Sequence, residues 1–192
     1  MPKSIIEPLL RDHARIRTLA GELRAHTERF DIPGIRHASQ QLIDTIRPHV
    51  LKEESILFLI GMKFLKADNR KLPELFKEHD QTLARLGRLT TLMFSARLTN
   101  IEDQARQLAF VIMEGLDHHL MEEESVVFPA LDKLIDEETK EYIIKRYNTI
   151  EGGEFDELDR LPLLSLPDSA MDISTDNIGS SDAGFGSMSG MG

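Results

Sequence analysis

Apolar residues in the first 150 positions recur every third or fourth residue, which is the spacing of one face of an α-helix. The pattern continues through four long stretches, and each stretch includes a histidine among its inward positions. No stretch alternates apolar and polar residues as a strand would. The expected inward positions are Ile6, Leu9, His13, Ile16, Ala20 and Leu23 in the first stretch, Leu42, Ile46, His49, Glu53, Ile56 and Ile60 in the second, Phe76, His79, Leu83, Leu86, Thr90 and Met93 in the third, and Ala105, Leu108, Ile112, Gly115, His119, Glu123, Val126 and Ala130 in the fourth.

Proline, glycine and capping residues divide the chain into helices. Asp31–Gly34 is expected to end the first helix and turn the chain, and the second helix then runs from about residue 35 to residue 64. Pro48 lies inside this second helix. A proline there removes one backbone hydrogen bond, so we expect a bend directly before His49.

Two connectors separate the remaining helices, over residues 66–72 and 95–100. Asn100 and Asp103 at the end of the second connector resemble a capping pair for the fourth helix. A fifth, shorter helix is expected over Asp136–Tyr147, with the aspartate as its cap.

These elements predict an all-α fold, an up-down-up-down four-helix bundle with a short fifth helix, over residues 1–150. Residues 151–192 are expected to be a linker and a low-complexity tail. No Lys, Arg or Glu occurs after Arg160, and residues 168–192 are mostly Asp, Ser, Gly, Met and Ala. Such a segment cannot bury enough apolar surface to offset its ordering entropy, so we predict that the tail is disordered.

The composition excludes several functional classes. The chain has no cysteine, which excludes disulfides, thiolate metal ligands and a cysteine nucleophile. A formal charge of -10 argues against nucleic acid or an anionic membrane as a partner. No apolar run is long enough to span a membrane, and charged residues interrupt the N-terminal segment where a signal peptide would be apolar. We therefore expect a cytoplasmic protein, with no protein partner indicated.

An internal repeat carries the candidate chemistry. His49–Phe58 reads HVLKEESILF and His119–Phe128 reads HLMEEESVVF. Each copy places a histidine and a glutamate four residues apart, and therefore on one face of a helix. The first and third helices each add one inward histidine, His13 and His79. Imidazole and carboxylate ligands without a thiolate suit iron best, and manganese or zinc less well.

Burial of two glutamates explains why metal ions are expected. Two carboxylates among apolar side chains would be strongly unfavourable unless cations compensated them. The predicted ligands of two ions are His13, His49, Glu53, His79, His119 and Glu123.

Other histidines and acids could compete for these roles. His118 and Glu122 have the same spacing as His119 and Glu123, but the repeat and the helical phase favour the latter pair. His26 and His37 are expected in solvent. Outside the six ligands, Glu54, Glu122 and Glu124 are expected to be solvated or to support the ligands. Asp12 and Glu78 could only support the ligands, and the absence of any role is favoured for both.

The pattern H…HxxxE…H…HxxxE over His13–Glu123 resembles the hemerythrin family, in its HHE cation-binding branch. The resemblance implies a non-haem di-iron centre in a four-helix bundle, in which Glu53 and Glu123 bridge the ions. It further implies that His13 and His49 bind one iron and that His79 and His119 bind the other. O2, nitric oxide or peroxide would then be the small ligand.

The sequence also departs from the oxygen carriers of that family. The carriers have an HxxxH pair on the third helix, whereas Leu75 and Leu83 stand four residues before and after His79 here. Sensing, storage or scavenging of O2 or a related oxidant is therefore expected rather than simple oxygen carriage. The alternatives are an enzyme that acts on peroxide or nitric oxide, and an iron-dependent interaction or iron-homeostasis module. A ferritin-like bundle would use ExxH motifs instead.

Overall fold

A computed structural model of the chain describes residues 4–64, 71–94 and 100–152. Every regular element in these ranges is helical, which confirms the predicted all-α class. The α-helices are α1 (Glu7–Glu28), α2 (Ile32–Lys52), α3 (Phe58–Phe64), α4 (Lys71–Phe94), α5 (Ile101–Glu122), α6 (Phe128–Leu134) and α7 (Glu137–Glu151), and two π-helical turns are η1 (Glu53–Leu57) and η2 (Glu123–Val127).

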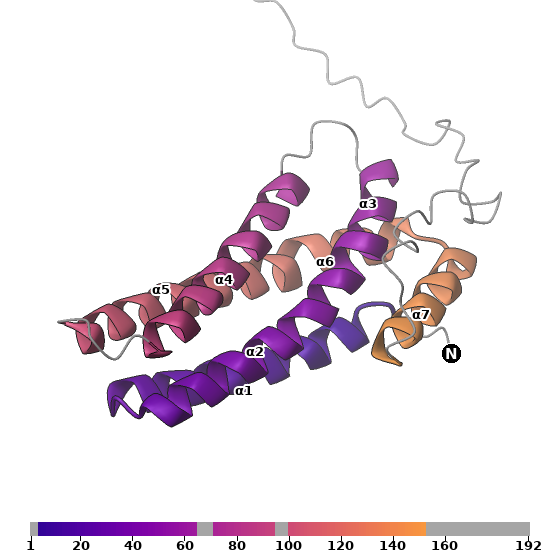
Figure 1. The fold of residues 1–192 in the computed structure, drawn as a ribbon. Helices are drawn as coiled ribbons and strands as arrows, with labels where there is room; N and C mark the ends of the chain where they lie inside the picture. Colours follow the sequence, from indigo (N-terminus) through magenta and orange to yellow (C-terminus); the bar gives the residue numbers. More distant parts are fainter. Residues whose placement is uncertain (1–3, 65–70, 95–99, 153–192) are drawn as a thin grey trace, which may run out of the picture.

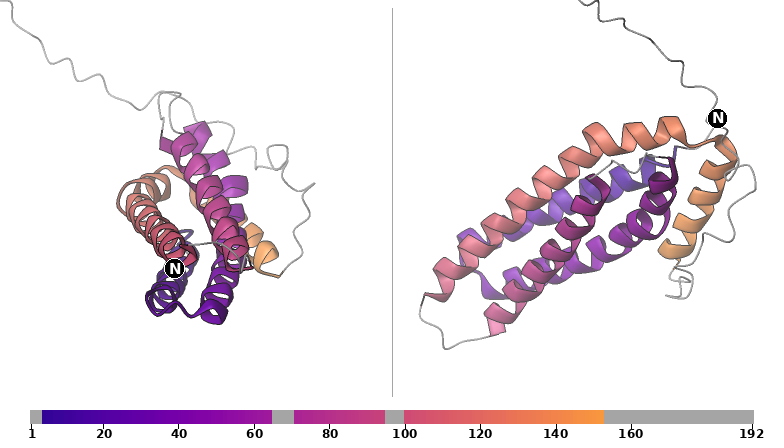
Figure 2. Two further views of the ribbon diagram at one scale, coloured as in Figure 1. Left: turned by 60° about the vertical axis from the view of Figure 1, so that its left-hand side comes forward. Right: turned by 90° about the horizontal axis from the view of Figure 1, so that it is seen from above.

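The long helices form a bundle. Helix α1 packs against α2 and α5, and α4 packs against α5 and α2, so each of the four has two long neighbours. Figure 1 shows the α1–α2 and α4–α5 pairs side by side. Helix α7 lies across one end of the bundle, where it contacts α2 and η1 (Figure 2).

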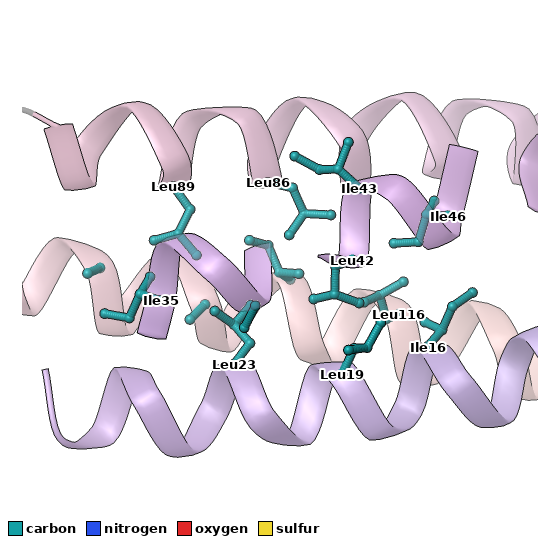
Figure 3. Packing of buried hydrophobic residues seen from close by; sticks show 14 of the residues in the cluster. Ile16, Leu19, Leu23, Ile35, Leu42, Ile43, Ile46, Leu86, Leu89 and Leu116 are labelled. Atoms are coloured by element: carbon teal, nitrogen blue, oxygen red, sulfur yellow. The ribbon is translucent and has the colours of Figure 1, made fainter. Parts of the chain in front are cut away.

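The apolar core is divided into two clusters along the bundle. Figure 3 shows the larger cluster, in which side chains of α1, α2, α4 and α5, such as Ile16, Leu42 and Leu116, point toward one another. The second cluster joins the start of α1 to η1, α6 and α7, through residues such as Leu9 and Phe128. The stretch between the two clusters holds the polar residues described below.

Several helix ends differ from the prediction. Asp31–Gly34 begins the second helix rather than ending the first, because Oδ1 of Asp31 accepts a hydrogen bond from the backbone N–H of Gly34 at 3.2 Å. Phe30 makes the turn instead, with a φ of 51°. The predicted capping pair is also wrong: Asn100 has a φ of 64° and its side chain caps nothing.

Other boundaries agree with the prediction or lie outside the described residues. Asp136 caps α7 as expected, since its Oδ1 accepts from the N–H of Thr139 at 2.7 Å. The predicted connector at 66–72 is only partly described, and Leu72 already lies buried in α4. The second connector before Asn100 and the predicted disordered tail from residue 153 onward lie outside the described residues.

The two π-helical turns change which residues face the core in the helical segments that follow them. In each turn the N–H of a phenylalanine bonds to the carbonyl of the glutamate five residues earlier, Phe58 to Glu53 and Phe128 to Glu123. The wider turn advances the phase by one residue. Val127 is therefore buried, whereas Val126, which regular helical phase placed inward, is 54% exposed.

Candidate metal centre

The structure brings together all six predicted ligand side chains from four parts of the bundle. His13 comes from α1, His79 from α4, and the two HxxxE motifs supply the remaining four from the α2–η1 and α5–η2 junctions. All six side chains are buried, and both glutamates are 0% exposed. They occupy the stretch between the two apolar clusters.

The first group of donors consists of His13, His49, Glu53 and Glu123, whose candidate ligand atoms all lie within 4.8 Å of one another. The Nε2 atoms of His13 and His49 are 3.2 Å apart. Nε2 of His13 is 3.3 Å from Oε2 of Glu123 and 3.8 Å from Oε1 of Glu53.

The second group mirrors the first with His79 and His119, and it uses the same two glutamates. The Nε2 atoms of His79 and His119 are 2.8 Å apart. Nε2 of His79 is 3.2 Å from Oε2 of Glu53, and Nε2 of His119 is 3.3 Å from Oε1 of Glu123. Two sets of two imidazoles therefore share two carboxylates.

A second glutamate directly follows each HxxxE motif, Glu54 in the first copy and Glu124 in the second. Each accepts a hydrogen bond from the single inward histidine of the other half of the chain. Nδ1 of His13 donates to Oε1 of Glu124 at 2.8 Å, and Nδ1 of His79 donates to Oε1 of Glu54 at 2.8 Å. Each of these hydrogen bonds leaves the Nε2 atom of the ring directed toward the two buried glutamates.

A further acid stands behind each histidine of the repeated motif, contrary to the expectation that Asp12 and Glu78 have no role. Nδ1 of His119 donates to Oε2 of Glu78 at 2.8 Å. Oδ2 of Asp12 lies 3.4 Å from Nδ1 of His49, as an ion-pair contact without hydrogen-bond geometry. Each acid directly precedes the single histidine of its own half, so one helical turn positions both residues.

The π-helical turns bring a phenylalanine onto the same face as the glutamate five residues earlier. Phe58 is thereby placed beside His79, and the two rings are stacked with their centroids 6.1 Å apart. Phe128 likewise packs against His13 at a centroid distance of 5.3 Å. Each phenylalanine thus limits the movement of one imidazole and separates it from water.

The charges inside the group shift its pKa values. Burial lowers the pKa of His13 and of His79, but contacts with the buried glutamates outweigh burial and raise both values to about 10. Burial and the charge of Glu53 raise the pKa of Glu123 to about 8. Burial and the charge of His79 lower the pKa of His119 to about 4. The metal-free group therefore retains protons near neutral pH.

The chemistry of these donors fits a pair of metal ions. The four carboxylate oxygens of Glu53 and Glu123 are buried, and none of them makes a hydrogen bond with a residue that the structure describes. A buried carboxylate without such a partner is strongly unfavourable, and cations held between the imidazoles and the carboxylates would compensate both charges. Imidazole nitrogens and carboxylate oxygens are donors that iron accepts.

The competing residues lie elsewhere. His118 is exposed on the outer face of α5, where it forms a separate group with Glu78 and Glu122. His37 is exposed, as expected. His26 was expected in solvent but is half-buried, and its Nδ1 donates to Oδ2 of Asp31 at 2.8 Å.

Three residues around the centre were not predicted from the sequence: Lys52, Glu151 and Tyr147. Nζ of Lys52, which is 2% exposed, donates to Asp12 at 2.9 Å and to Glu151 of α7 at 2.7 Å. Tyr147 of α7 is fully buried, and its hydroxyl has no hydrogen-bond partner among the described residues. Burial, followed by the charges of Glu53 and Asp12, raises its pKa well above the usual value. In the sequence, Lys52 is marked only by its position inside the first copy of the repeat, and Tyr147 and Glu151 only by their position in the last helical segment.

Fold and site together define a helical-bundle protein of the metal-binding class. The family model of the hemerythrin HHE cation binding domain matches residues 4–131, which is most of the chain. The chain therefore belongs to the hemerythrin family, as its motif pattern indicated. Comparison with curated proteins gave no match. No helix in the described ranges is both long and apolar enough to cross a membrane.

Proposed function

We propose that this chain is a non-haem di-iron protein that binds O2 or a related small oxidant, for sensing, storage or scavenging. In this proposal the four long helical segments run up-down-up-down within residues 1–150, and residues 151–192 supply no ligand. His13 and His49 would hold one iron, His79 and His119 would hold the other, and Glu53 and Glu123 would be shared by both. The cytoplasmic location stays a prediction.

The observation that carries this proposal is the pair of shared glutamates. Each of the two donor groups contains both Glu53 and Glu123, and the four carboxylate oxygens have no hydrogen-bond partner among the described residues. A single ion would leave one pair of imidazoles without a cation beside the same carboxylates. Two ions match the duplicated donor set and the near two-fold repeat.

When bound, two irons supply two exchangeable electrons and open coordination positions for a small oxidant. The protein residues orient the donors and exclude water. Glu124 and Glu54 hold the Nδ1 protons of His13 and His79, which leaves each Nε2 lone pair free for the centre. The apolar clusters on both sides keep the site dry, so the buried charges interact strongly.

The absence of a second histidine on α4 favours a role other than oxygen carriage. Leu75 is fully buried and Leu83 packs against the larger core cluster, so neither position offers a donor. Each ion would hold only two imidazoles, which leaves more positions for exchangeable ligands. The same observation supports the alternative of an enzyme that acts on peroxide or nitric oxide.

Iron content and oxidant reactivity test the proposal together. Protein purified under iron-replete conditions should contain two irons per chain, and the reduced form should develop a near-ultraviolet band on exposure to O2. A spectral change that persists while O2 is present and reverses when O2 is removed supports binding. Sustained consumption of peroxide or nitric oxide would support the enzymatic alternative, and iron-free folded protein would contradict both.

A further inference from the structure

A groove with a volume of about 360 Å³ lies between α1 and α5 on the outside of the bundle. Its rim carries two basic and two acidic side chains, Arg17, Arg24, Glu114 and Asp117, all of them exposed. The opposite charges balance, so the rim favours neither an anion nor a cation. Between the charged residues the groove is lined by apolar side chains and by Gly21.

The floor of the groove adjoins the metal ligands. It is formed by Ile16, Leu116 and Leu120, which are at most 5% exposed. Ile16 lies one helical turn after His13 on the same face of α1, and Leu116 lies one turn before His119 on the same face of α5. One turn is about 5 Å along the helix axis. The floor is therefore the layer of side chains next to these two imidazoles.

The two helices that form the groove contribute to both donor groups. His13 of α1 belongs to the first group, and His119 of α5 belongs to the second. The rim also connects to the first group, because Nη1 of Arg17 lies 2.7 Å from Oε1 of Glu124, the acid that accepts from Nδ1 of His13. A small molecule that passes the floor would thus arrive between the two ions of the proposed centre.

The chemistry of the floor determines what can pass. Its aliphatic side chains offer neither charge nor hydrogen bonds, so an ion would lose its hydration there without compensation. A small, uncharged and weakly hydrated molecule has no such cost. Its passage requires only transient rotation of isoleucine and leucine side chains.

We infer that the groove between α1 and α5 is a route by which an uncharged diatomic gas, O2 or nitric oxide, reaches the centre. The gas passes between Ile16, Leu116 and Leu120. The inference rests on the proposed function and narrows it, since it selects a neutral gas over a charged ligand.

Gly21 allows the route to be blocked without disturbing the core. It lines the groove, and a Cβ atom added there meets no described atom within 4 Å. Side chains of a helix lean toward its N-terminus, so the ring in Gly21→Phe should lie over the part of the groove nearest Arg17 and the centre. Gly87 of α4 is the matched control, because it has the same free space and does not line this groove.

NMR of the metal-free full chain under O2 pressure tests the route without iron. O2 is paramagnetic, so it speeds the relaxation of the methyl groups that it contacts. The methyl groups of Ile16 and Leu120 should relax faster than those of Leu42 and Leu86, which are equally buried in the same cluster. Gly21→Phe should reduce this difference. Equal relaxation at all four residues would overturn the inference.

Stopped-flow mixing of the reduced, iron-loaded protein with O2 or nitric oxide measures entry into the centre. In Gly21→Phe, association and dissociation should both slow several-fold with an unchanged Kd, because a barrier in the route opposes entry and exit alike. Gly87→Phe should leave both rates unchanged. Circular dichroism verifies that each variant is folded. Unchanged rates in folded Gly21→Phe, or equal slowing by Gly87→Phe, would overturn the inference.

The reciprocal variant opens the floor. Leu116→Ala leaves a cavity beside His119 and should speed association several-fold. Leu89→Ala is its control, since Leu89 is buried in the same cluster but comes from α4 and does not line the groove. Equal acceleration by both variants would contradict a defined route. If the iron-loaded protein bound neither gas, the proposed function would fail, whereas O2 relaxation in the metal-free chain would still decide the route.

Discussion

Removal of metal should lower the stability of the bundle, because the centre lies in its middle. Without cations, Glu53 and Glu123 remain at 0% exposure with no hydrogen bonds from the described residues. The protein then relies on protonated His13 and His79 for compensation, since their pKa values are about 10. These internal ion pairs replace the metal only in part.

The size of the effect follows from linkage between binding and folding. An ion that binds only the native state stabilises it by RT ln(1 + [L]/Kd), which is about 4 kcal/mol at a thousandfold excess over Kd. For a domain of about 150 residues, each kcal/mol changes Tm by about 2–4 °C. One tightly bound ion should therefore raise Tm by about 8–16 °C, and the second ion should add to this.

The difference should depend on pH in a defined direction. Because the metal-free group retains protons on His13 and His79 below about pH 10 and the loaded group cannot, loading must release these protons. Each released proton lowers the apparent affinity about tenfold per unit fall in pH. The difference in Tm should be larger at pH 8 than at pH 6.

Differential scanning calorimetry of chelator-treated and iron-loaded protein measures this difference. The same difference should persist after deletion of residues 161–192, because that segment contains none of the six ligands. Equal Tm values for the two forms at pH 8 would refute the structural role of the centre. A difference that disappears with the tail would show that the domain boundary is wrong.

Five substitutions at four positions test other parts of the structure. His119→Ala should remove most of the bound iron and His118→Ala should not, as measured by iron per chain; the opposite result would move the site by one residue. Lys52→Met should lower the free energy of unfolding in urea by about 1–2 kcal/mol, which is less than for a fully buried ion pair because the acidic partners of Lys52 are partly exposed. Amide hydrogen exchange in α7 should become faster in this variant. Unchanged exchange would show that Lys52 does not couple α7 to the centre. Asp136→Ala should cost about 1 kcal/mol through loss of the cap on α7, and Asp136→Asn should restore most of it.

The six candidate ligands could be found from the sequence because the signal is local and repeated. Four-residue spacing puts His49 and Glu53 on one helical face whatever the rest of the fold does. The second copy at His119 and Glu123 then sets the phase: His119 is buried, and His118, one position away, is exposed.

The π-helical turns could not be predicted from periodicity. In each copy the residues at the end of the π turn are consecutive apolar positions, Ile56–Phe58 and Val126–Phe128, so hydrophobic spacing does not show where one residue is added. The prediction of Val126 as an inward residue failed for this reason. The turns depend on tertiary packing, since they let Phe58 and Phe128 reach histidines of the opposite half.

The partners of the acids behind the ligands, and the role of Lys52, were beyond sequence reasoning because their contacts join distant segments. Glu124 reaches His13 across the bundle, and Lys52 connects α2 to Glu151 of α7. A charged residue beside a ligand normally lies in solvent, so its sequence position does not distinguish the two cases. Helix packing determines which of these charges turn toward the centre.

Anomalous diffraction at the iron edge from crystals of the iron-loaded protein tests the central claim most directly. Two peaks should appear in each chain, one among His13, His49 and the two glutamates, the other among His79, His119 and the same glutamates. A single peak would contradict the dinuclear centre. A peak at the outer group of Glu78, His118 and Glu122, with none inside the bundle, would contradict the ligand assignment itself.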